Sequence, residues 1–290
     1  MSQELPVRYL RVASSHRITP RMVRVTFTGD GLGGAALSGP DRQVKLYFPR
    51  PGQERPVLPR PDGDVMRWYE AYNAIPEDER PWMRSFTVRG HDPARGTLDI
   101  DFVVHGDSGP ATRWAQDVRP GAVLGMFGPS DMFAVPVDLH GPDHVVLLGD
   151  ESALPAIGTL LEALPEDTAA TAVVEIADAA EEQPLPDPER VDLRWVHRGG
   201  APHGQRLLEE VRAADLPTER VGVWIGGEAG MVRGLRRHMV GERGIGKAAI
   251  DFTGYWRRAL TQDDAPTPED MADAQELLTR AGSDGGARQA

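Results

Sequence analysis

The sequence predicts two consecutive domains, an antiparallel six-stranded β-barrel followed by an α/β domain built on a parallel sheet. In the first half, short apolar runs with partial alternation are bounded by Gly, Pro or Asp, as in closed antiparallel barrels. In the second half, strand-like apolar runs alternate with segments of helical spacing. The 290 residues suffice for two ordinary domains. We expect the domains at residues 1–141 and 142–260, followed by an acidic tail at 261–290.

The barrel strands are expected where alternation is clearest and turn residues flank the run. A long connection, residues 50–81, separates the third and fourth of these strands and is rich in Pro, Arg and acidic residues. Connections of this length are usually functional lids or mobile insertions. The six expected strands are 7–18, 22–29, 43–49, 83–90, 97–106 and 122–129.

The second half begins with HVVLLGD, a continuous apolar run typical of a strand buried on both faces. Ligands of such domains bind beyond the carboxyl ends of the strands. The tail after Leu260 has few aromatic residues and much acid, and predicts a mobile segment with one short helix at 267–281. The expected strands are 144–150, 171–178, 191–198, 221–230 and 247–256, and the expected helices are 152–165, 204–216 and 230–244.

Composition excludes several classes of function. The chain has no cysteine, which excludes disulfides, thiolate nucleophiles and cysteine-bound iron–sulfur clusters. A net charge of -12 argues against a nucleic-acid partner, and no apolar run is long enough to predict a membrane span. The eight histidines form no ligand pair at helical or finger spacing, so we expect no protein-held metal. We expect a cytoplasmic protein; the sequence predicts neither its catalytic residue nor its oligomeric state.

The segment RSFTVR combines groups that suit a flat, phosphorylated ligand. Strand alternation places Arg84, Phe86 and Val88 on one face, and Ser85 and Thr87 on the other. Arg84 can pair with a phosphate, and Phe86 can cover part of a planar ring. The Thr87 hydroxyl can hydrogen-bond a ring heteroatom. The alternative is a plain amphipathic strand with surface arginines.

The segment VVHGDSGPATRWA adds an expected helix start. Pro110 suits a first helical turn, where free amides attract an anion, and Gly109, Ala111 and Thr112 complete that turn. His105, at the preceding turn, can stack or hydrogen-bond, or it can be a structural histidine. The two segments together offer one phosphate an arginine and another a helix N-terminus.

Five segments in order resemble one known family. RSFTVR, VVHGDSGPATRWA, LLGDESALPAI, IGGEAGMVRGLRRHM and GYWRRA resemble the siderophore-interacting protein family of FAD-dependent ferric-siderophore reductases, within the ferredoxin-reductase-like group. The resemblance covers roughly residues 5 to 260. It implies a flavin-binding barrel with FAD, a nucleotide-binding-like second domain, and reduction of iron held by a small chelator, a ferric siderophore. Iron would then be substrate and not a protein-bound centre.

The resemblance also implies which residues hold the flavin. Tyr255 or Trp256 would abut the flavin edge, as a terminal aromatic does in the wider group, although either can instead seal the domain interface. Two departures stand out, because Phe86 occupies a position where the family pattern usually has tyrosine and Ala259 one where it has glycine. The FAD-binding set implied is Arg84, Ser85, Phe86, Thr87, Val88, His105, Gly109, Pro110, Ala111, Thr112, Tyr255 and Trp256.

A donor site is expected at the strand ends of the second domain. The turn after residues 144–148 lacks the glycine fingerprint of dinucleotide sites, and Asp150 and Glu151 would repel phosphate unless turned away. Glu175 and Asp178 lie about where an acid meets a ribose hydroxyl, which favours NADH over NADPH; the alternative is a solvated acidic loop. Ferredoxin is a further possible donor. The expected donor-site residues are Gly149, Asp150, Glu151, Ser152, Gly227 and Glu228.

An anionic chelate would require a basic rim. Lysine occurs only as Lys45 and Lys247, which makes Lys45 notable in an acidic chain. Lys45, Arg50 and Arg67 precede or lie in the long connection and are the expected substrate-binding residues. Two other functions remain open: an electron-transfer reductase serving a biosynthetic partner, and a non-catalytic protein that binds a small molecule or flavin.

Overall fold

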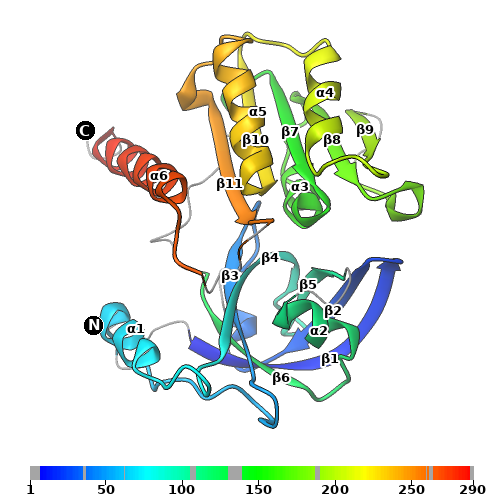
Figure 1. Ribbon diagram of the computed structural model, residues 1–290. Coiled ribbons are helices and arrows are strands. Elements are labelled where there is room, and N and C mark those ends of the chain that lie inside the picture. The colour runs from blue at the N-terminus through cyan, green and yellow to red at the C-terminus, as the bar shows by residue number, and fades with distance from the viewer. Residues whose placement is uncertain are drawn as a thin grey trace.

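The computed structural model consists of a β-barrel and an α/β domain stacked on each other (Figure 1). His105 and Ala259, singled out from the sequence, lie outside the part of the chain that it describes. The described residues are 7–34, 37–61, 63–104, 109–129, 139–186, 190–258, 260 and 264–287.

The first domain is a closed barrel of six antiparallel strands, which confirms the predicted fold. Alternate residues point inward, as in β2, where Val25 and Phe27 are fully buried and Arg24 and Thr26 are not. The strands, in the order β1-β2-β5-β4-β3-β6 around the barrel, are β1 (Val7–Thr19), β2 (Met22–Thr28), β5 (Thr97–Val103), β4 (Trp82–Asp92), β3 (Gln43–Phe48) and β6 (Val123–Phe127).

The long connection between β3 and β4 is anchored by helix α1 (Val65–Asn73). Asp64 accepts a hydrogen bond from the Arg67 amide and so caps the helix start. Trp68 and Tyr72 are buried against Tyr47 and Phe127 on the outside of the barrel. The segment is therefore a packed part of the domain, in contrast to the lid or mobile insertion that its composition suggests.

The second domain has a five-stranded parallel sheet in the order β11-β10-β7-β8-β9, as predicted. Helix α3 packs on one face of the sheet, with α4 and α5 on the other (Figure 1). The elements are β7 (His144–Asp150), α3 (Leu154–Glu162), β8 (Ala169–Ile176), β9 (Val191–His197), α4 (Gln205–Ala213), β10 (Val221–Glu228), α5 (Ala229–Gly241) and β11 (Ile250–Trp256).

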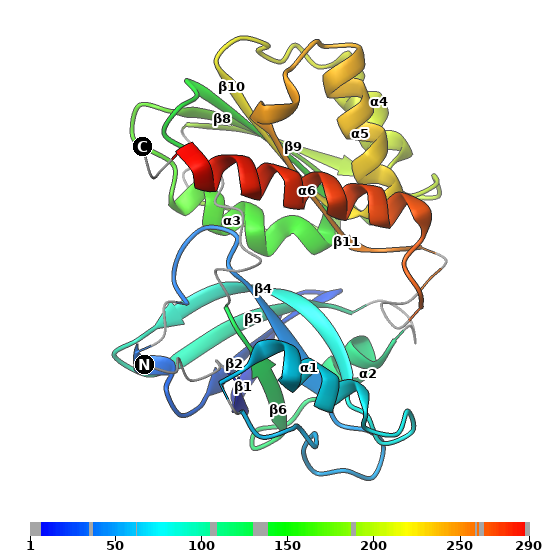
Figure 2. The ribbon, with the colours of Figure 1, turned by 90° about the vertical axis from the view of Figure 1, so that its left-hand side faces the viewer.

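The C-terminal helix α6 (Pro268–Ala287) is longer than the short helix expected in the tail. It lies beside edge strand β11 (Figures 1 and 2), held by ion pairs of its acidic side chains. Asp270 pairs with Arg233 and Arg257, and Glu276 pairs with Arg236. The acid that suggests a mobile tail therefore contacts the second domain. Among the described helices, none combines the length and apolarity that a membrane crossing requires.

Each domain inserts one carboxylate into the other. Glu181 of the second domain accepts hydrogen bonds from the Thr19 hydroxyl at 2.6 Å and the Arg21 amide at 3.2 Å, at the β1–β2 turn. Asp41 of the barrel accepts hydrogen bonds from Trp224 on β10 and Tyr255 on β11. These contacts fix the carboxyl ends of the parallel strands over one end of the barrel.

Candidate functional site

A cavity of about 470 Å³ lies between the two domains, within the size range of small-molecule sites. It brings together most of the residues that the sequence assigned to FAD. The barrel contributes Gln43, Arg84, Ser85, Phe86, Thr87, Asp101, Phe102, Val103, Gly109, Pro110, Ala111 and Thr112; the remainder of the chain contributes Glu151, Ser152, Pro155, Tyr255, Trp256, Arg257, Arg258 and Leu260.

The barrel side of the cavity has an aromatic floor. Phe86 lies with its ring centroid 4.6 Å from that of Phe102, and Phe102 lies 5.6 Å from Trp114. Phe86 is only half-buried and packs against the barrel core, so its ring is shared between the core and the cavity. Such a floor suits a planar aromatic ligand.

Strands β4 and β5, which carry Phe86 and Phe102, also place two charged side chains at the cavity. The Arg84 side chain is 9% exposed and donates to the carbonyl of Met83 at 2.7 Å. Asp101, also at the cavity, is held by a bidentate pair with Arg24, with N–O distances of 2.7 and 2.8 Å. The cavity therefore offers a fixed guanidinium and a fixed carboxylate above an apolar floor.

The start of helix α2 (Pro110–Gln116) forms the other polar wall. Gly109 caps it with φ +87°, has no side chain to occupy the first-turn amides, and leaves open space where a Cβ would stand. Thr112 directs its hydroxyl to the carbonyl of Val103 at 3.4 Å, so this hydroxyl supports the turn. The exposed amides of such a turn suit a phosphate oxygen.

The second domain closes the cavity with residues 255–258, at the end of β11 and just beyond it. Tyr255 turns its hydroxyl to Asp41 at 3.1 Å, and Trp256 donates its indole N–H to Asp150 at 3.1 Å. Arg257 pairs with Asp270 of α6, whereas Arg258 is exposed at the cavity rim. The sequence left open whether these two aromatic residues border the flavin or seal the domain interface. The two roles are compatible, because both residues line the cavity. The Tyr255 hydroxyl also bonds the barrel, and the Trp256 indole bonds the end of β7.

The strand-to-helix turn after β7 is filled by its own polar network. The fully buried Asp150 accepts hydrogen bonds from five groups: the Ser152 amide and hydroxyl, the Glu228 amide, the His203 ring and the Trp256 indole. Burial alone would raise its pKa, but these hydrogen bonds, led by His203 and Ser152, hold the pKa below its ordinary value. Asp150 is thus turned inward, whereas Glu151 lines the cavity.

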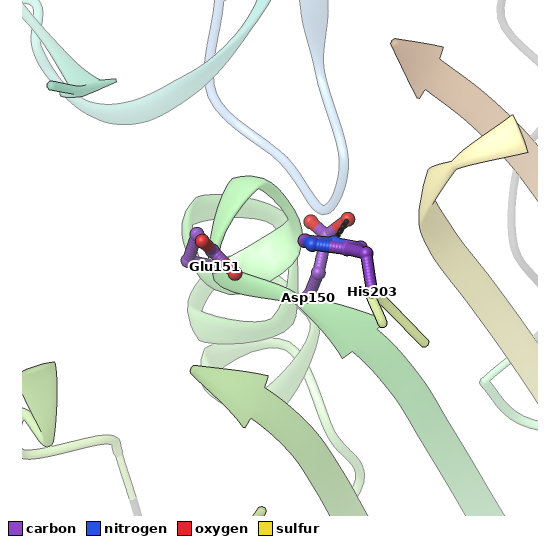
Figure 3. A group of neighbouring side chains, drawn as sticks. All are labelled: Asp150, Glu151 and His203. Atoms are coloured by element: carbon purple, nitrogen blue, oxygen red, sulfur yellow. Dashed lines mark hydrogen bonds and ion pairs between the residues drawn. The ribbon is translucent and has the colours of Figure 1, made fainter. Parts of the chain in front are cut away.

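The same network accounts for a group of three potential metal ligands, Asp150, Glu151 and His203 (Figure 3). Arg198 donates to Glu151 at 2.7 Å and to His203 Nδ1 at 2.8 Å. This guanidinium supplies the positive charge that a cation would bring. Ser152 and Glu151 reach the cavity from this edge, whereas Gly149, Gly227 and Glu228 do not line it. Glu228 instead caps α5 through the Met231 amide.

The expectation that Glu175 meets a ribose hydroxyl is wrong. Its side chain is fully buried and accepts hydrogen bonds from the amides of Gly204 and Leu207 at the start of α4. The Arg198 guanidinium also donates to it, with an N–O distance of 3.3 Å. Asp178 caps a short turn through the Ala180 amide. The sequence argument for NADH over NADPH therefore fails. The Glu175 carboxylate is already hydrogen-bonded within the protein, and a basic residue, Arg198, lies next to it.

The predicted basic rim is not at the cavity. Arg50 donates to the carbonyls of Glu77 and Arg80 and lies 4.2 Å from the Trp82 ring, which makes it an anchor of the long connection. Arg67 pairs with Asp64 at the start of α1. Lys45 is half-buried on β3, and burial lowers its pKa.

Val88 is likewise misassigned as a cofactor contact. Its side chain is 2% exposed within the barrel core, and it is absent from the cavity lining. A register shift between Val88 and Gly90 ends the simple alternation of β4. Residues beyond the shift cannot be assigned to a face by counting in twos.

Sequence reasoning missed several residues of the site. Asp41, Asp101 and Arg198 come from three different segments, and only folding brings them to the cavity or its walls. Arg257 and Arg258 also line the cavity and could have been predicted from the sequence. They directly follow Tyr255 and Trp256, which had already been assigned to the site.

Both domains match models of known protein families. Residues 11–133 match the family model of the siderophore-interacting FAD-binding domain, and residues 142–259 match that of the siderophore-interacting protein. A solved siderophore utilization protein from T. fusca is 39% identical, with a TM-score of 0.76, over 90% of this chain and 97% of that one.

Two curated relatives have named activities. The ferric vibriobactin reductase ViuB of Vibrio cholerae is 28% identical over 91% of this chain and 95% of its own. The NADPH-dependent ferric-chelate reductase of Escherichia coli is 29% identical over 87% of this chain and 94% of its own.

More distant structures establish the wider fold. The ferredoxin reductase of carbazole 1,9a-dioxygenase superposes with a TM-score of 0.62 at 14% identity, over 86% of this chain and 69% of that one. The likeness confirms the predicted ferredoxin-reductase-like architecture. Together, the two family models in order and the 39% identical structure show that this chain belongs to the siderophore-interacting protein family.

Proposed function

We propose that the protein is a flavin-dependent oxidoreductase that reduces Fe(III) in a ferric siderophore and releases Fe(II). One observation carries this proposal: a single interdomain cavity combines an aromatic floor, a fixed arginine, an uncapped helix turn and a cationic rim. The named activities of the Vibrio and Escherichia relatives support it.

The cavity fits FAD by its chemistry. Arg84 and the amides after Gly109 would hold the phosphates, and Phe86 would lie against the ring system. The Thr87 hydroxyl, which lines the cavity and is otherwise buried, would meet a ring heteroatom. When bound, FAD supplies the redox chemistry, since it accepts two electrons and releases them singly.

The chain's own residues would position the iron chelate. Arg257 is paired with Asp270, but Arg258 is exposed at the rim, so an anionic chelate meets positive charge there despite the net charge of -12. Screening confines such surface attraction to about 8–10 Å, so the local rim decides the outcome. Hard oxygen ligands favour Fe(III), and reduction therefore loosens the chelate.

The electron donor is NADH, NADPH or a reduced ferredoxin. The filled turn at Asp150 disfavours the usual pyrophosphate position, and a nicotinamide nucleotide would have to approach from the cavity side, past Ser152 and Trp256. The Escherichia relative is named for NADPH, which makes this nucleotide the first donor to assay.

The experiment is anaerobic reduction of a panel of ferric siderophores by the FAD-loaded protein, with each donor in turn. The reduced flavin is expected to be reoxidised by at least one chelate. Arg258→Glu should raise the KM for an anionic chelate several-fold, less so at high salt, while Lys45→Glu leaves it unchanged. A chemically reduced protein that no ferric chelate reoxidises would refute the proposal and favour a non-catalytic binding protein.

A further inference from the structure

An acidic side chain that has no role in the proposed function lies behind the cavity and is hydrogen-bonded to two of its lining residues, Tyr255 and Gln43. Asp41 follows Gly39 and Pro40 in the loop before β3 and adopts φ +45°, a left-handed conformation that aspartate tolerates. Its amide donates to the Thr159 hydroxyl of α3 at 3.1 Å. The loop is thus built into the second domain by its backbone as well as its side chain.

The Asp41 carboxylate accepts three hydrogen bonds. Oδ1 accepts from the Tyr255 hydroxyl at 3.1 Å and from Gln43 at 3.3 Å, and Oδ2 accepts from the Trp224 indole at 3.2 Å. None of the ion pairs found among the described residues involves Asp41. Burial raises its pKa to about 6, opposed by the hydrogen bonds from Tyr255 and Trp224 and supported by the nearby charge of Asp251.

A chain of hydroxyls connects this acid to the cavity. The Tyr255 hydroxyl donates to Asp41 at 3.1 Å, and the Thr87 hydroxyl beside it acts to lower the pKa of Tyr255, as a donor to the phenol oxygen does. Thr87 and the Tyr255 ring both line the cavity. Burial and the Asp41 charge raise the pKa of Tyr255, with Asp150 contributing in the same direction, so its hydroxyl stays protonated and can relay a proton without becoming anionic.

We propose that Asp41 accepts, through the hydroxyls of Tyr255 and Thr87, the proton that leaves the cavity when a reduced flavin gives its electrons to iron. The inference rests on the proposed function for its redox partners. With FAD bound, two Fe(III) ions would take one electron each, and one proton would have to leave the cavity to balance the two electrons. That proton passes to Thr87 as the Thr87 proton passes to Tyr255 and the Tyr255 proton to Asp41.

The arrangement meets the requirements of such a proton acceptor. At neutral pH an acid with a pKa of about 6 is mostly ionised and can accept a proton. Because this pKa is near the working pH, the acid also binds that proton more strongly than an ordinary aspartate would. One-electron transfers to iron carry no proton away, so a separate acceptor for the proton is needed.

A matched control exists within the same interface. Glu181 also crosses between the domains as a buried carboxylate, but it contacts Thr19 and Arg21 at the β1–β2 turn and does not line the cavity. If Asp41 served only to join the domains, Glu181→Gln and Asp41→Asn would have the same consequences. The two variants therefore separate proton transfer from a loosened interface.

The first test uses the apoprotein. Carbon-13 NMR of labelled aspartate carboxyls, assigned with Asp41→Asn, should show one carboxyl that titrates near pH 6. Tyr255→Phe, which keeps the ring and removes the hydroxyl, should shift that midpoint upward because the charged form loses a donor. Titration of Asp41 at its ordinary value near 4 would overturn the proposal.

The second test isolates proton release from iron chemistry. The FAD-loaded protein is reduced with dithionite and mixed anaerobically with ferricyanide, a one-electron acceptor that takes up no proton at neutral pH. Reoxidation should be about 10²-fold slower in Asp41→Asn and Tyr255→Phe, at the lower end of the contribution of a positioned acid–base group. The wild-type rate should fall below pH 6 and show a solvent deuterium effect, and both features should vanish in the variants.

Ferricyanide also keeps the two proposals distinguishable. A wild-type protein that ferricyanide reoxidises but ferric siderophores do not would refute the reductase proposal and leave the proton route standing. Asp41→Glu should restore part of the rate, and Glu181→Gln should keep the wild-type rate and deuterium effect. Equal slowing in Glu181→Gln and Asp41→Asn, or a wild-type rate in Asp41→Asn, would overturn the proton route.

Discussion

The two walls of the interdomain cavity differ in whether their backbone amides are already hydrogen-bonded to the protein. On the barrel side, Gly109 leaves the first-turn amides of α2 without a side-chain cap, and Arg84 is aimed at the same space. On the second-domain side, the turn after β7 satisfies its amides internally, because Asp150 accepts from Ser152 and Glu228.

The difference shows that position in a fold does not by itself make a ligand site. The turn after β7 lies at the strand ends, where parallel α/β domains bind dinucleotides. Its buried carboxylate has replaced the ligand's negative charge, so the edge serves stability. The barrel turn has no such replacement, so it remains available to an anion. Variants of each wall should therefore affect different properties.

The largest expected effect is on folding, from Asp150→Asn. The amide nitrogen of asparagine would face donors that now meet a carboxylate oxygen, and the unfolding free energy at pH 7 should fall by about 3 kcal/mol. The measurement is urea unfolding of the apoprotein. Asp143→Asn, which disrupts an exposed pair with Arg220, should change little.

The stabilisation by Asp150 should depend on pH in a defined direction. The folded pKa of Asp150 lies below its unfolded value, so its contribution is complete above about pH 4 and is lost as the pH falls through the folded pKa. The gap between wild type and Asp150→Asn should thus narrow below pH 4. A gap that widens in acid would mean that Asp150 is protonated in the folded protein.

The next effect is on cofactor retention, from Arg84→Ala. Loss of a charge-assisted phosphate contact should cost about 1.5–3 kcal/mol, or roughly 10- to 150-fold in the FAD dissociation constant. Calorimetric titration of the apoprotein measures it directly. Arg95→Ala, on the exposed hairpin between β4 and β5, should bind FAD as wild type does. Equal affinity in Arg84→Ala would remove this arginine from the site.

A smaller effect is expected from Gly109→Ala. A Cβ would meet open space, so the penalty comes from the backbone, whose φ of +87° and ψ of 158° suit glycine alone, at roughly 1–3 kcal/mol. Gly96→Ala is a matched control, because Gly96 has φ +61° and open surroundings in the β4–β5 hairpin. Both variants should lose stability, and only Gly109→Ala should weaken FAD binding, by up to tenfold. Equal FAD binding in the two variants would show that the turn holds no phosphate.

The fold follows from the sequence because its signals are local. Alternating runs in the first half, and the change to helical spacing after residue 150, are properties of neighbouring residues. The same holds for the flavin segments, because Arg84 to Thr87 and Gly109 to Thr112 each lie within one element. Such segments can be recognised without knowing what they pack against.

The errors concern residues whose partners are distant in sequence. Glu175 looks like a free acid at a strand end until α4 supplies its amides, and Arg50 looks like a surface cation until residues 77–80 fold back on it. Asp41 gave no signal, because its partners lie about 180 and 210 residues further along. Whether a polar group is available is decided by tertiary hydrogen bonding.

The smallest expected effect, from Phe86→Tyr, tests how far the barrel wall is adapted to this chain. The family pattern usually has tyrosine at this position, and an added hydroxyl that finds its partner is worth about 0.5–1.5 kcal/mol, so FAD should bind up to about tenfold more tightly. The half-buried ring lines the cavity but also packs against Phe102 at 4.6 Å. Calorimetry should show a lower dissociation constant with unchanged unfolding. Weaker binding with lost stability would instead mean that Phe48, Phe102 and the ring of Phe86 have packed together so closely that the floor no longer accepts a hydroxyl.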